Sequence, residues 1–289
     1  MPALAGPDEL VTAPIGQPVD RLAEPRGKPR VLIGTSGYSY DDWVGPVYPP
    51  GSQKQDFLFL YSREFPVVEL NFSYYKQPAP RTLERMVNAT PDNFLFALKA
   101  HRSMTHEIGE NWDNEISTFR AGIKPLVETN RLAAVLLQFP YSFGYTPESR
   151  ERLATLCERL EGLPLAVEFR KSDWLRPQVL EGLRQRRAAI VSVDEPNLPK
   201  LLRPTTEVTS DMAYLRFHGR NKAQWWTGDN ASRYDYLYDS GELGEWVERI
   251  RIILSQVHTM LIFFNNHWRG SAAQNARMMR DILAQRGLA

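Results

Sequence analysis

AVLLQFPYSFGYTPESRERLATLCERLEGLPLAVEFR, residues 134–170, contains the pattern that decides the fold. Two short apolar runs, 134–139 and 165–170, are typical of buried strands, and the stretch 147–161 between them has the spacing of an amphipathic helix. A strand, a helix and a second strand in this order predict a parallel βαβ unit.

The same alternation continues on both sides of this unit. With the two runs above, the chain has eight strand candidates, the others at 31–36, 67–71, 94–100, 188–194, 213–219 and 260–266. The other helical stretches are expected at 54–64, 80–89, 114–129, 173–187, 242–256 and 271–286, with a short turn near 197–202. Eight such units predict a TIM (β/α)8 barrel. The rival is a doubly wound open sheet, which usually carries a GxGxxG turn after its first strand, and GTSGYSY at 34–40 lacks that spacing.

Composition and cysteine usage place the chain among ordinary globular proteins. The 289 residues are 43% hydrophobic and 24% charged, with a net charge of +1 that offers no general attraction to nucleic acid or membranes. No apolar run approaches the roughly 20 residues that span a bilayer. Cys157, the only cysteine, excludes an internal disulfide and is expected to be buried in its helix, as in a cytoplasmic protein. Residues 1–29 are Pro-rich without a signal-peptide pattern, so we expect a flexible tail there and one barrel domain at 30–289.

Polar side chains end most of the predicted strands, and TIM barrels carry their sites at the carboxyl ends of strands. Residues two apart on a strand share a face. Four polar pairs are therefore predicted to face the barrel axis: Glu69 with Asn71, Glu168 with Arg170, Ser192 with Asp194, and Arg216 with His218. The residues between the members of each pair are apolar and are expected to face the surrounding helices: Leu70, Phe169, Val193 and Phe217.

These strand ends supply the candidate catalytic residues Glu69, Lys99, Glu168, Asp194 and His218. Glu168 or Asp194 would act as general base and His218 or His101 as acid, while Lys99 or the arginines stabilise negative charge. Glu168, Asp194, His218 and Glu69 also have the oxygen and imidazole ligands that Mg, Mn or Zn accept, so a divalent metal stays open although no HExxH motif is present. Alternatively, these carboxylates and cations neutralise each other as structural ion pairs.

Two loops have the features of an anion site. Gly270 and Ser271, a potential N-cap, begin the last helix, where free N–H groups favour phosphate or carboxylate. After strand seven, Gly219 allows close backbone approach and Arg220 adds a donor. A capped helix and a surface arginine explain the same residues without a ligand. Further expected ligand-binding residues are Tyr38, Asn71, Gln138, Arg170, Arg216, Asn265 and Asn266.

Aromatic residues crowd the same loops: Tyr38, Tyr40 and Trp43, then Tyr74 and Tyr75, then Trp225, Trp226, Tyr234 and Tyr236. They would either stack on a sugar or base, or seal the top of the barrel.

Seven stretches in order resemble the successive motifs of the YecE-like family, catalogued as domain of unknown function seventy-two: IGTSGYSYDDWVGPVYP, VVELNFSYYKQP, FLFALKAHRSMTHE, LLQFPYSF, LAVEFRKSDW, LRFHGRN and FFNNHWRGSAAQNA. The resemblance implies a TIM barrel and no established reaction. Beyond the residues above, its pattern adds Ser36 and His106 as ligand-binding candidates, together with Gly34, Gly37, Thr105, Pro140, Trp174 and Asn275. Tyr38 stands where many relatives have tryptophan, and Tyr74 where phenylalanine is common.

Three functions follow as hypotheses. The first is an enzyme that acts by acid/base chemistry on a small polar anionic ligand, phosphosugar or nucleotide-like, with hydrolysis, lysis and isomerisation open. The second is a non-catalytic barrel that binds a ligand or a protein partner. The third is a metal-dependent hydrolase of nucleic acid, suggested by the basic stretch LRQRRAA at 183–189, although these arginines lie on a predicted outer helix whose face is solvated.

Overall fold

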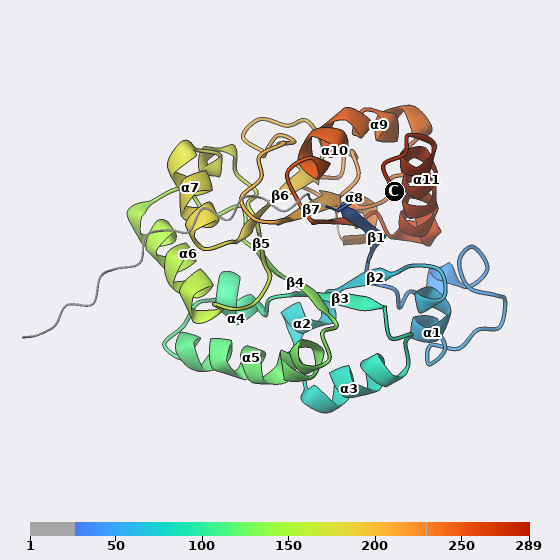
Figure 1. The fold of residues 1–289 in the computed structure, drawn as a ribbon, viewed down its shortest axis with the longest axis horizontal. Coiled ribbons are helices and arrows are strands. Elements are labelled where there is room, and N and C mark those ends of the chain that lie inside the picture. The colour runs from blue at the N-terminus through green and yellow to red at the C-terminus, as the bar shows by residue number, and fades with distance from the viewer. Residues whose placement is uncertain (1–26, 229) are drawn as a thin grey trace, which may run out of the picture.

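The strands close into a barrel. The computed structural model describes residues 27–228 and 230–289, in which eight parallel strands pair in chain order and β8 pairs with β1 (Figure 1). The strands are β1 Arg30–Ser36, β2 Val67–Leu70, β3 Leu95–Lys99, β4 Leu132–Gln138, β5 Leu165–Glu168, β6 Ala189–Asp194, β7 Met212–Phe217 and β8 Thr259–Phe264. The predicted TIM barrel is confirmed.

Helices fill most connections between the strands and surround the barrel (Figure 1). The α-helices are α1 Phe57–Ser62, α2 Phe72–Tyr75, α3 Pro80–Asn88, α4 Arg102–Thr105, α5 Trp112–Glu128, α6 Pro147–Arg159, α7 Pro177–Gln185, α8 Asn230–Arg233, α9 Ser240–Gly244, α10 Val247–Leu254 and α11 Ser271–Gln285. Single 3-10 turns are η1 Asp41–Trp43, η2 Ser172–Trp174 and η3 Trp268–Gly270. The helix expected at 242–256 is divided into α9 and α10, and residues 195–211 between β6 and β7 contain no helix.

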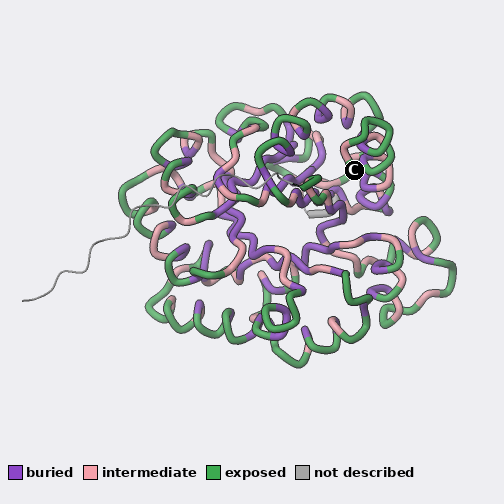
Figure 2. The backbone as a smooth tube through the Cα atoms, in the orientation of Figure 1, coloured by how far each residue is buried: buried purple, intermediate pink, exposed green. Residues whose placement is uncertain are grey.

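Two apolar layers lie on the two faces of the strands. The inner layer fills the barrel with small and branched side chains, among them Leu32, Val67, Ala97, Ala134, Leu136, Ala166, Val191 and Leu261. The outer layer packs the strands against the helices, and Figure 2 shows buried backbone along the strands with exposed backbone on the outer sides of the helices. Leu70, Phe169 and Phe217 belong to the outer layer, as predicted. The polar partners on β2, β5 and β7 consequently face the barrel axis, above the apolar interior.

Strand β6 turns its polar residues the other way. Val191 and Val193 belong to the inner layer. The Ser192 hydroxyl donates to the carbonyl oxygen of Thr205 at 2.8 Å, and the Asp194 carboxylate accepts from the indole N–H of Trp246 at 2.7 Å. The prediction that Ser192 and Asp194 face the axis is therefore wrong. On this strand Val191 and Val193 fill the barrel interior, because Ser192 and Asp194 form their hydrogen bonds with residues outside the barrel.

Other expectations concern the tail, the cysteine and membrane spans. Residues 1–26 of the expected tail lie outside the described residues. Cys157 is buried in α6 as expected, and burial raises the pKa of its thiol to about 12, so it is no thiolate nucleophile near neutral pH. Within the described ranges, every helix is too short or too polar to cross a membrane.

A tyrosine hydroxyl joins β1 to β2 where the two strands approach each other. The backbone N–H of Thr35 donates to the Tyr61 hydroxyl at 2.8 Å, and that hydroxyl donates to the carbonyl oxygen of Val67 at 3.0 Å. Gly34 leaves room for this bridge, because a Cβ there would lie 2.0 Å from the Val67 carbonyl oxygen. The buried Tyr61 hydroxyl thus gives two buried backbone groups a hydrogen-bond partner.

We predict that Tyr61→Phe lowers the free energy of unfolding by about 1–3 kcal/mol, since a buried N–H and a carbonyl lose their partner. Urea denaturation followed by circular dichroism measures the change. Tyr75→Phe is the control, because Tyr75 is largely exposed and its loss of a hydroxyl should cost little. Equal effects of the two substitutions would contradict the bridging role of Tyr61.

Candidate functional site

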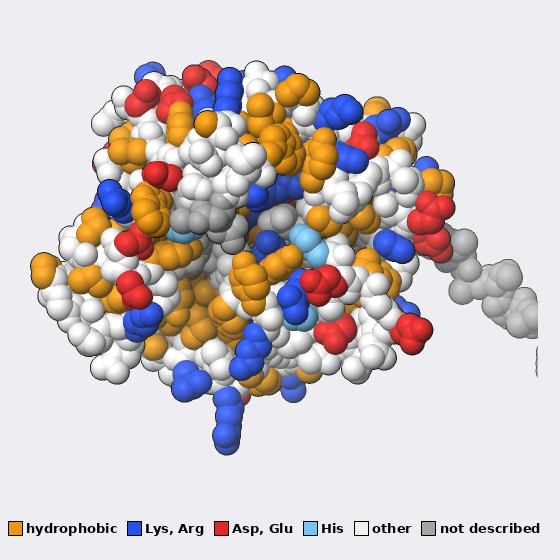
Figure 3. Space-filling model, turned by 180° about the vertical axis from the view of Figure 1, so that it is seen from behind, with side chains coloured by type: hydrophobic (Ala, Val, Ile, Leu, Met, Phe, Trp, Pro, Cys, Tyr) orange, Lys and Arg blue, Asp and Glu red, His pale blue; other side chains and the backbone are white. Residues whose placement is uncertain are grey.

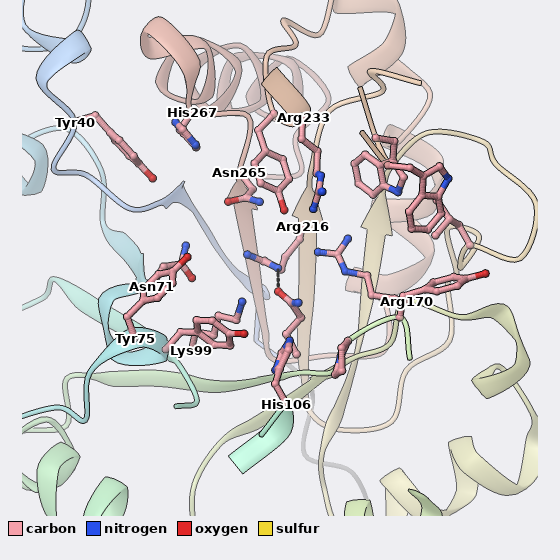
Figure 4. Close-up of a pocket in the computed structure, with 18 residues that line it drawn as sticks. Tyr40, Asn71, Tyr75, Lys99, His106, Arg170, Arg216, Arg233, Asn265 and His267 are labelled. Atoms are coloured by element: carbon pink, nitrogen blue, oxygen red, sulfur yellow. Dashed lines mark hydrogen bonds between the residues drawn. The ribbon is translucent and has the colours of Figure 1, made fainter. Parts of the chain in front are cut away.

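A cavity of about 510 Å³ opens at the carboxyl ends of the strands (Figure 4). This volume suits a small molecule. Its lining includes seven residues predicted from the sequence as site residues: Asn71, Lys99, His106, Gln138, Arg170, Arg216 and Asn265. The other lining residues are Tyr40, Tyr74, Tyr75, Pro140, Tyr141, Leu201, Trp225, Trp226, Arg233, Tyr234 and His267.

The charge of this lining has one sign. Lys99, Arg170, Arg216 and Arg233 reach the cavity, whereas no Asp or Glu of the described residues lines it. Figure 3 shows Lys and Arg side chains in a hollow near the middle of the face it draws. The carboxylates predicted for this mouth, Glu69 and Glu168, are completely buried beneath it.

Arg216 is held between these two carboxylates and is itself only 2% exposed. Its Nη2 lies 2.6 Å from Oε1 of Glu69, and its Nη1 lies 2.6 Å from Oε2 of Glu168. The other oxygen of Glu69 accepts a hydrogen bond from the Tyr214 hydroxyl at 2.6 Å. Above them, Nη1 of Arg216 also donates to Gln138 at 3.5 Å, the bond drawn dashed in Figure 4. The guanidinium is thereby fixed at the floor of the cavity.

Glu168 has two further cationic or imidazole neighbours. Nη2 of Arg170 and Nε2 of His218 each lie 3.3 Å from its Oε1. Burial works against ionisation, but the charges of Arg216 and Arg170 outweigh it and hold the pKa of Glu168 well below its usual range. Glu168 is therefore a carboxylate at neutral pH and a weak base, which disfavours its predicted role as general base.

His218 is fully buried below the cavity and does not line it. Burial lowers the pKa of its imidazole to about 4, so the ring is neutral near pH 7. With the amide of Asn265 donating to Nδ1 at 3.1 Å, the ring proton belongs on Nε2, which faces Glu168. In this arrangement His218 supports Glu168 from beneath.

Lys99 extends from the end of β3 to the cavity wall. Its Nζ lies 4.1 Å from the centroid of the Tyr74 ring. Burial, and after it the neighbouring Arg216 charge, lower the pKa of Lys99 to about 7. Glu69 and Glu168 form their ion pairs with Arg216, and Lys99 has no ion pair among the described residues.

His106 stands beside Lys99 at the same wall. Its ring contacts Tyr74 edge-on, with centroids 4.9 Å apart, and its Nδ1 lies 2.8 Å from the Thr105 hydroxyl. Burial first, and then the positive charges of Lys99 and Arg170, lower the pKa of His106 to about 4. The ring is therefore neutral near pH 7 and available as a hydrogen-bonding group.

Asp194 lies in a separate polar cluster outside the barrel wall. Its two carboxylate oxygens accept hydrogen bonds from Arg220 at 2.9 and 2.7 Å, from the Tyr238 hydroxyl at 2.8 Å and from Trp246. Each of these partners packs Asp194 against the segments that follow β7. Asp194 and Arg220, predicted separately as site residues, thus join the end of β6 to the loop after β7, and neither residue lines the cavity.

The remaining predicted binding residues also lie outside the cavity lining: Ser36, Tyr38, Gly219, Asn266, Gly270 and Ser271. Tyr38 packs against the outer apolar layer, and the amide of Asn266 donates to Asn275. The expectation that Ser271 caps α11 is wrong: Gly270, with φ 83°, occupies the N-cap position and no side chain caps the helix. Gly270 adopts the left-handed conformation that this chain reversal requires.

Two charged residues near the site were not singled out from the sequence. Glu195 directly follows β6, and its Oε2 pairs with Arg170 at 3.0 Å. Burial raises the pKa of Glu195 to about 7. Its position at a strand end was a signal that could have identified it. Arg233 comes from α8 in a long loop, and no pattern in the sequence places that loop over the cavity.

The metal and nucleic-acid hypotheses gain no geometric support. In the ranges that the structure describes, no three His, Cys, Asp or Glu side chains are grouped to hold a metal ion. In the basic stretch at 183–189, Arg184 pairs with Glu207 at 3.0 Å and Arg186 with Glu158 at 2.8 Å, as in a solvated helix face.

We predict that Arg216→Met lowers the free energy of unfolding by about 3–5 kcal/mol at pH 8, because two buried carboxylates lose their cation. The loss should shrink at pH 5. In the native chain the lowered pKa of Glu168 gives stability that is present above the pKa of the unfolded chain and is lost as pH falls. In the variant, the buried Glu168 loses the Arg216 charge that holds its pKa down, so burial favours its protonated form and folding is less unfavourable at low pH.

Urea titrations at the two pH values test this expectation. Arg184→Met is the control, since its ion pairs are exposed and worth at most about 1 kcal/mol. A loss that is the same at pH 8 and pH 5 would show that Arg216 acts through packing alone.

Comparison with known proteins places the chain in a family. Residues 32–289 match the model of a family described as "Protein of unknown function DUF72". The Bacillus subtilis UPF0759 protein YunF is 33% identical over 272 residues, which are 88% of this chain and 94% of YunF. The Escherichia coli UPF0759 protein YecE is 28% identical over 191 residues, 63% of this chain and 65% of YecE.

Solved structures agree with the sequence comparisons. A DUF72 family protein from Thermotoga maritima is 39% identical, with a TM-score of 0.82 over 88% of this chain and 99% of that chain. A DUF72 family protein from Enterococcus faecalis is 29% identical, with a TM-score of 0.79 over 88% and 95% of the two chains. The chain therefore belongs to the YecE-like DUF72 family of TIM-barrel proteins, whose function is unknown.

Proposed function

We propose that the mouth of the barrel binds a small anionic ligand of the phosphosugar type and performs acid/base chemistry on it. The observation that carries this proposal is the cavity lining, in which four cationic side chains and no described carboxylate face the ligand space. Guanidinium and ammonium groups recognise phosphate and carboxylate through charge-assisted hydrogen bonds.

The layered arrangement of charge supports an anion. Glu69 and Glu168 lie below Arg216 and neutralise much of its charge from beneath. Lys99 and Arg233 have no ion pair with a described residue, and they reach the cavity from the end of β3 and from α8. A negatively charged ligand would neutralise the positive charge that remains in the cavity lining.

The neutral part of the lining favours a ligand with hydroxyl groups. The amides of Asn71, Gln138 and Asn265 each offer donors and acceptors at the cavity wall. Trp225 and Tyr234 lie against each other edge-on, with centroids 6.5 Å apart, and give the wall an aromatic surface. Amides beside aromatic rings suit the polar edge and the apolar face of a sugar ring.

Lys99 is the lining group best suited to exchange a proton. A catalytic acid or base works most effectively with a pKa near the operating pH, and the pKa of Lys99 is about 7. In this proposal Lys99 takes the catalytic part that the sequence suggested for Glu168 and Asp194, while the arginines hold the anion. A non-catalytic binding barrel is the alternative, in which Lys99 would contribute to affinity alone.

We predict that sulfate binds to the wild-type protein and that its affinity rises as pH falls from 8 to 6. Lys99 gains its positive charge as pH falls through about 7, whereas sulfate remains a dianion over this range. A bound anion that raises the pKa of Lys99 by about one unit would give up to about a tenfold change in affinity. Isothermal titration calorimetry measures both the affinity and the proton uptake.

Variants separate the contributions of the cations. Lys99→Met should bind sulfate with little dependence on pH, and Arg233→Met should bind it several-fold more weakly at every pH. Arg286→Met, at the exposed end of α11, is the matched control and should bind as the wild type does. Ribose 5-phosphate should bind more tightly than sulfate. If neither anion binds to the wild type, the anion site is not in this cavity. The same conclusion follows if Arg233→Met binds both anions as tightly as the wild type does.

A further inference from the structure

We propose that the ligand is an anionic carbonyl compound and that Lys99 forms an imine with its carbonyl carbon. This inference rests on the proposed function, because the anionic part of the ligand is the part that the arginines would hold. It goes further by giving Lys99 a covalent role and by naming the functional group on which it acts.

The Lys99 amine lies in the mouth of the barrel without an anionic partner. Lys99 ends β3, inside the barrel mouth, and its Nζ lies over the face of Tyr74. No carboxylate of the described chain pairs with it, since Glu69 and Glu168 are bound to Arg216. In Figure 4 the side chains of Lys99, Arg170, Arg216 and Arg233 all lie around the same space. A ligand anchored by the arginines would therefore meet a free amine.

The surroundings of this amine favour its unprotonated form. The charged and titratable groups around it are Arg216, Arg170, Glu69, Glu168, His106 and Tyr74. Burial lowers the pKa of Lys99 to about 7, and the repulsion of Arg216 acts in the same direction. Roughly half of the molecules then carry the unprotonated amine at pH 7, whereas an ordinary lysine is protonated almost completely. Burial beside another cation is a known way to activate a nucleophilic lysine.

A second lysine lies close to the cavity lining but differs from Lys99. Lys171 also lies over an aromatic ring, with Nζ 5.1 Å from the centroid of Tyr141, but it does not line the cavity. The lining thus contains one primary amine among three guanidinium groups, and guanidinium groups stay protonated and do not act as nucleophiles at neutral pH.

Imine formation joins the amine of Lys99 to the carbonyl carbon of the ligand and releases one molecule of water. The lone pair of Nζ attacks the carbonyl carbon, the electrons of the C=O double bond move to oxygen, and one N–H proton is transferred to that oxygen to give a carbinolamine. A proton from solvent then joins the hydroxyl group, which leaves as water while the nitrogen lone pair, restored by the proton transfer, forms the C=N bond. The product is a protonated imine, and no oxidant or reductant is consumed.

Reductive trapping tests this step. The full-length protein would be incubated at pH 7 with pyridoxal 5′-phosphate, an anionic aldehyde, then reduced with sodium borohydride and mapped by peptide mass spectrometry. We expect Lys99 to be labelled at low aldehyde concentration, with a rate that is half-maximal near pH 7, and we expect sulfate to slow the labelling. Labelling of surface lysines should require higher pH.

The control variants are Lys99→Arg, which keeps the positive charge and removes the nucleophile, and Lys76→Arg, which changes an exposed lysine at the C-cap of α2. Labelling should be lost in the first and unchanged in the second. Lys99→Met provides a second test if Lys99→Arg fails to fold, as judged by circular dichroism.

The outcomes separate this inference from the proposed function. If sulfate and ribose 5-phosphate bind but Lys99 is labelled no faster than Lys76, the imine is overturned while the anion site stands. Labelling that sulfate does not slow would likewise overturn it, because the aldehyde would then react without using the arginines. If no anion binds at all, both proposals fall together.

Discussion

Arg216 lies at the level where the apolar interior of the barrel gives way to the polar mouth, with one carboxylate on each side of its guanidinium. Removing any one of these three charges from water costs several kcal/mol, so each is tolerable only while the other two are in place. Glu69 comes from β2, Glu168 from β5 and Arg216 from β7. Three strands that are far apart in the chain are therefore coupled by charge, and the shape of the mouth depends on that coupling.

This coupling also determines which charge the ligand meets. The carboxylates lie beneath the guanidinium, and the cations face the open space. A chain with a net charge of +1 can in this way present a strongly positive cavity, because the field near a site depends on the depth of each group rather than on the total. Burial first, and then the charge of the same Arg216, lower the pKa of Lys99, so the residue that stabilises the barrel floor also contributes to the state of the amine above it.

The sequence predicted the barrel and much of its mouth because strands have a period of two. On β2, β5 and β7 the polar residues alternate with apolar ones that pack on the helices, and their inward direction followed from that pattern. On β6 both faces are largely apolar up to Ser192, so the pattern did not say which face the polar residues take. The partners that turn Asp194 outward, Tyr238 and Trp246, lie more than forty residues later in the chain. The sequence pattern also did not predict that Arg233 lines the cavity, because the path of the loop that carries it is set by tertiary packing.

A lysine with a lowered pKa responds differently to two kinds of anion. A simple anion such as sulfate brings negative charge close to Nζ and thereby favours the protonated amine, which is no longer a nucleophile. An anionic aldehyde brings the same charge, but its carbonyl carbon can also react with the unprotonated amine. The protonated imine that results keeps a positive charge at the position where the anion stabilises it. Charge stabilisation then favours the covalent product over the free amine, so a cationic cavity with a single neutral lysine selects ligands that have both an anion and a carbonyl group. A cavity with the same arginines and a permanently protonated lysine would bind both kinds of ligand without distinguishing the carbonyl.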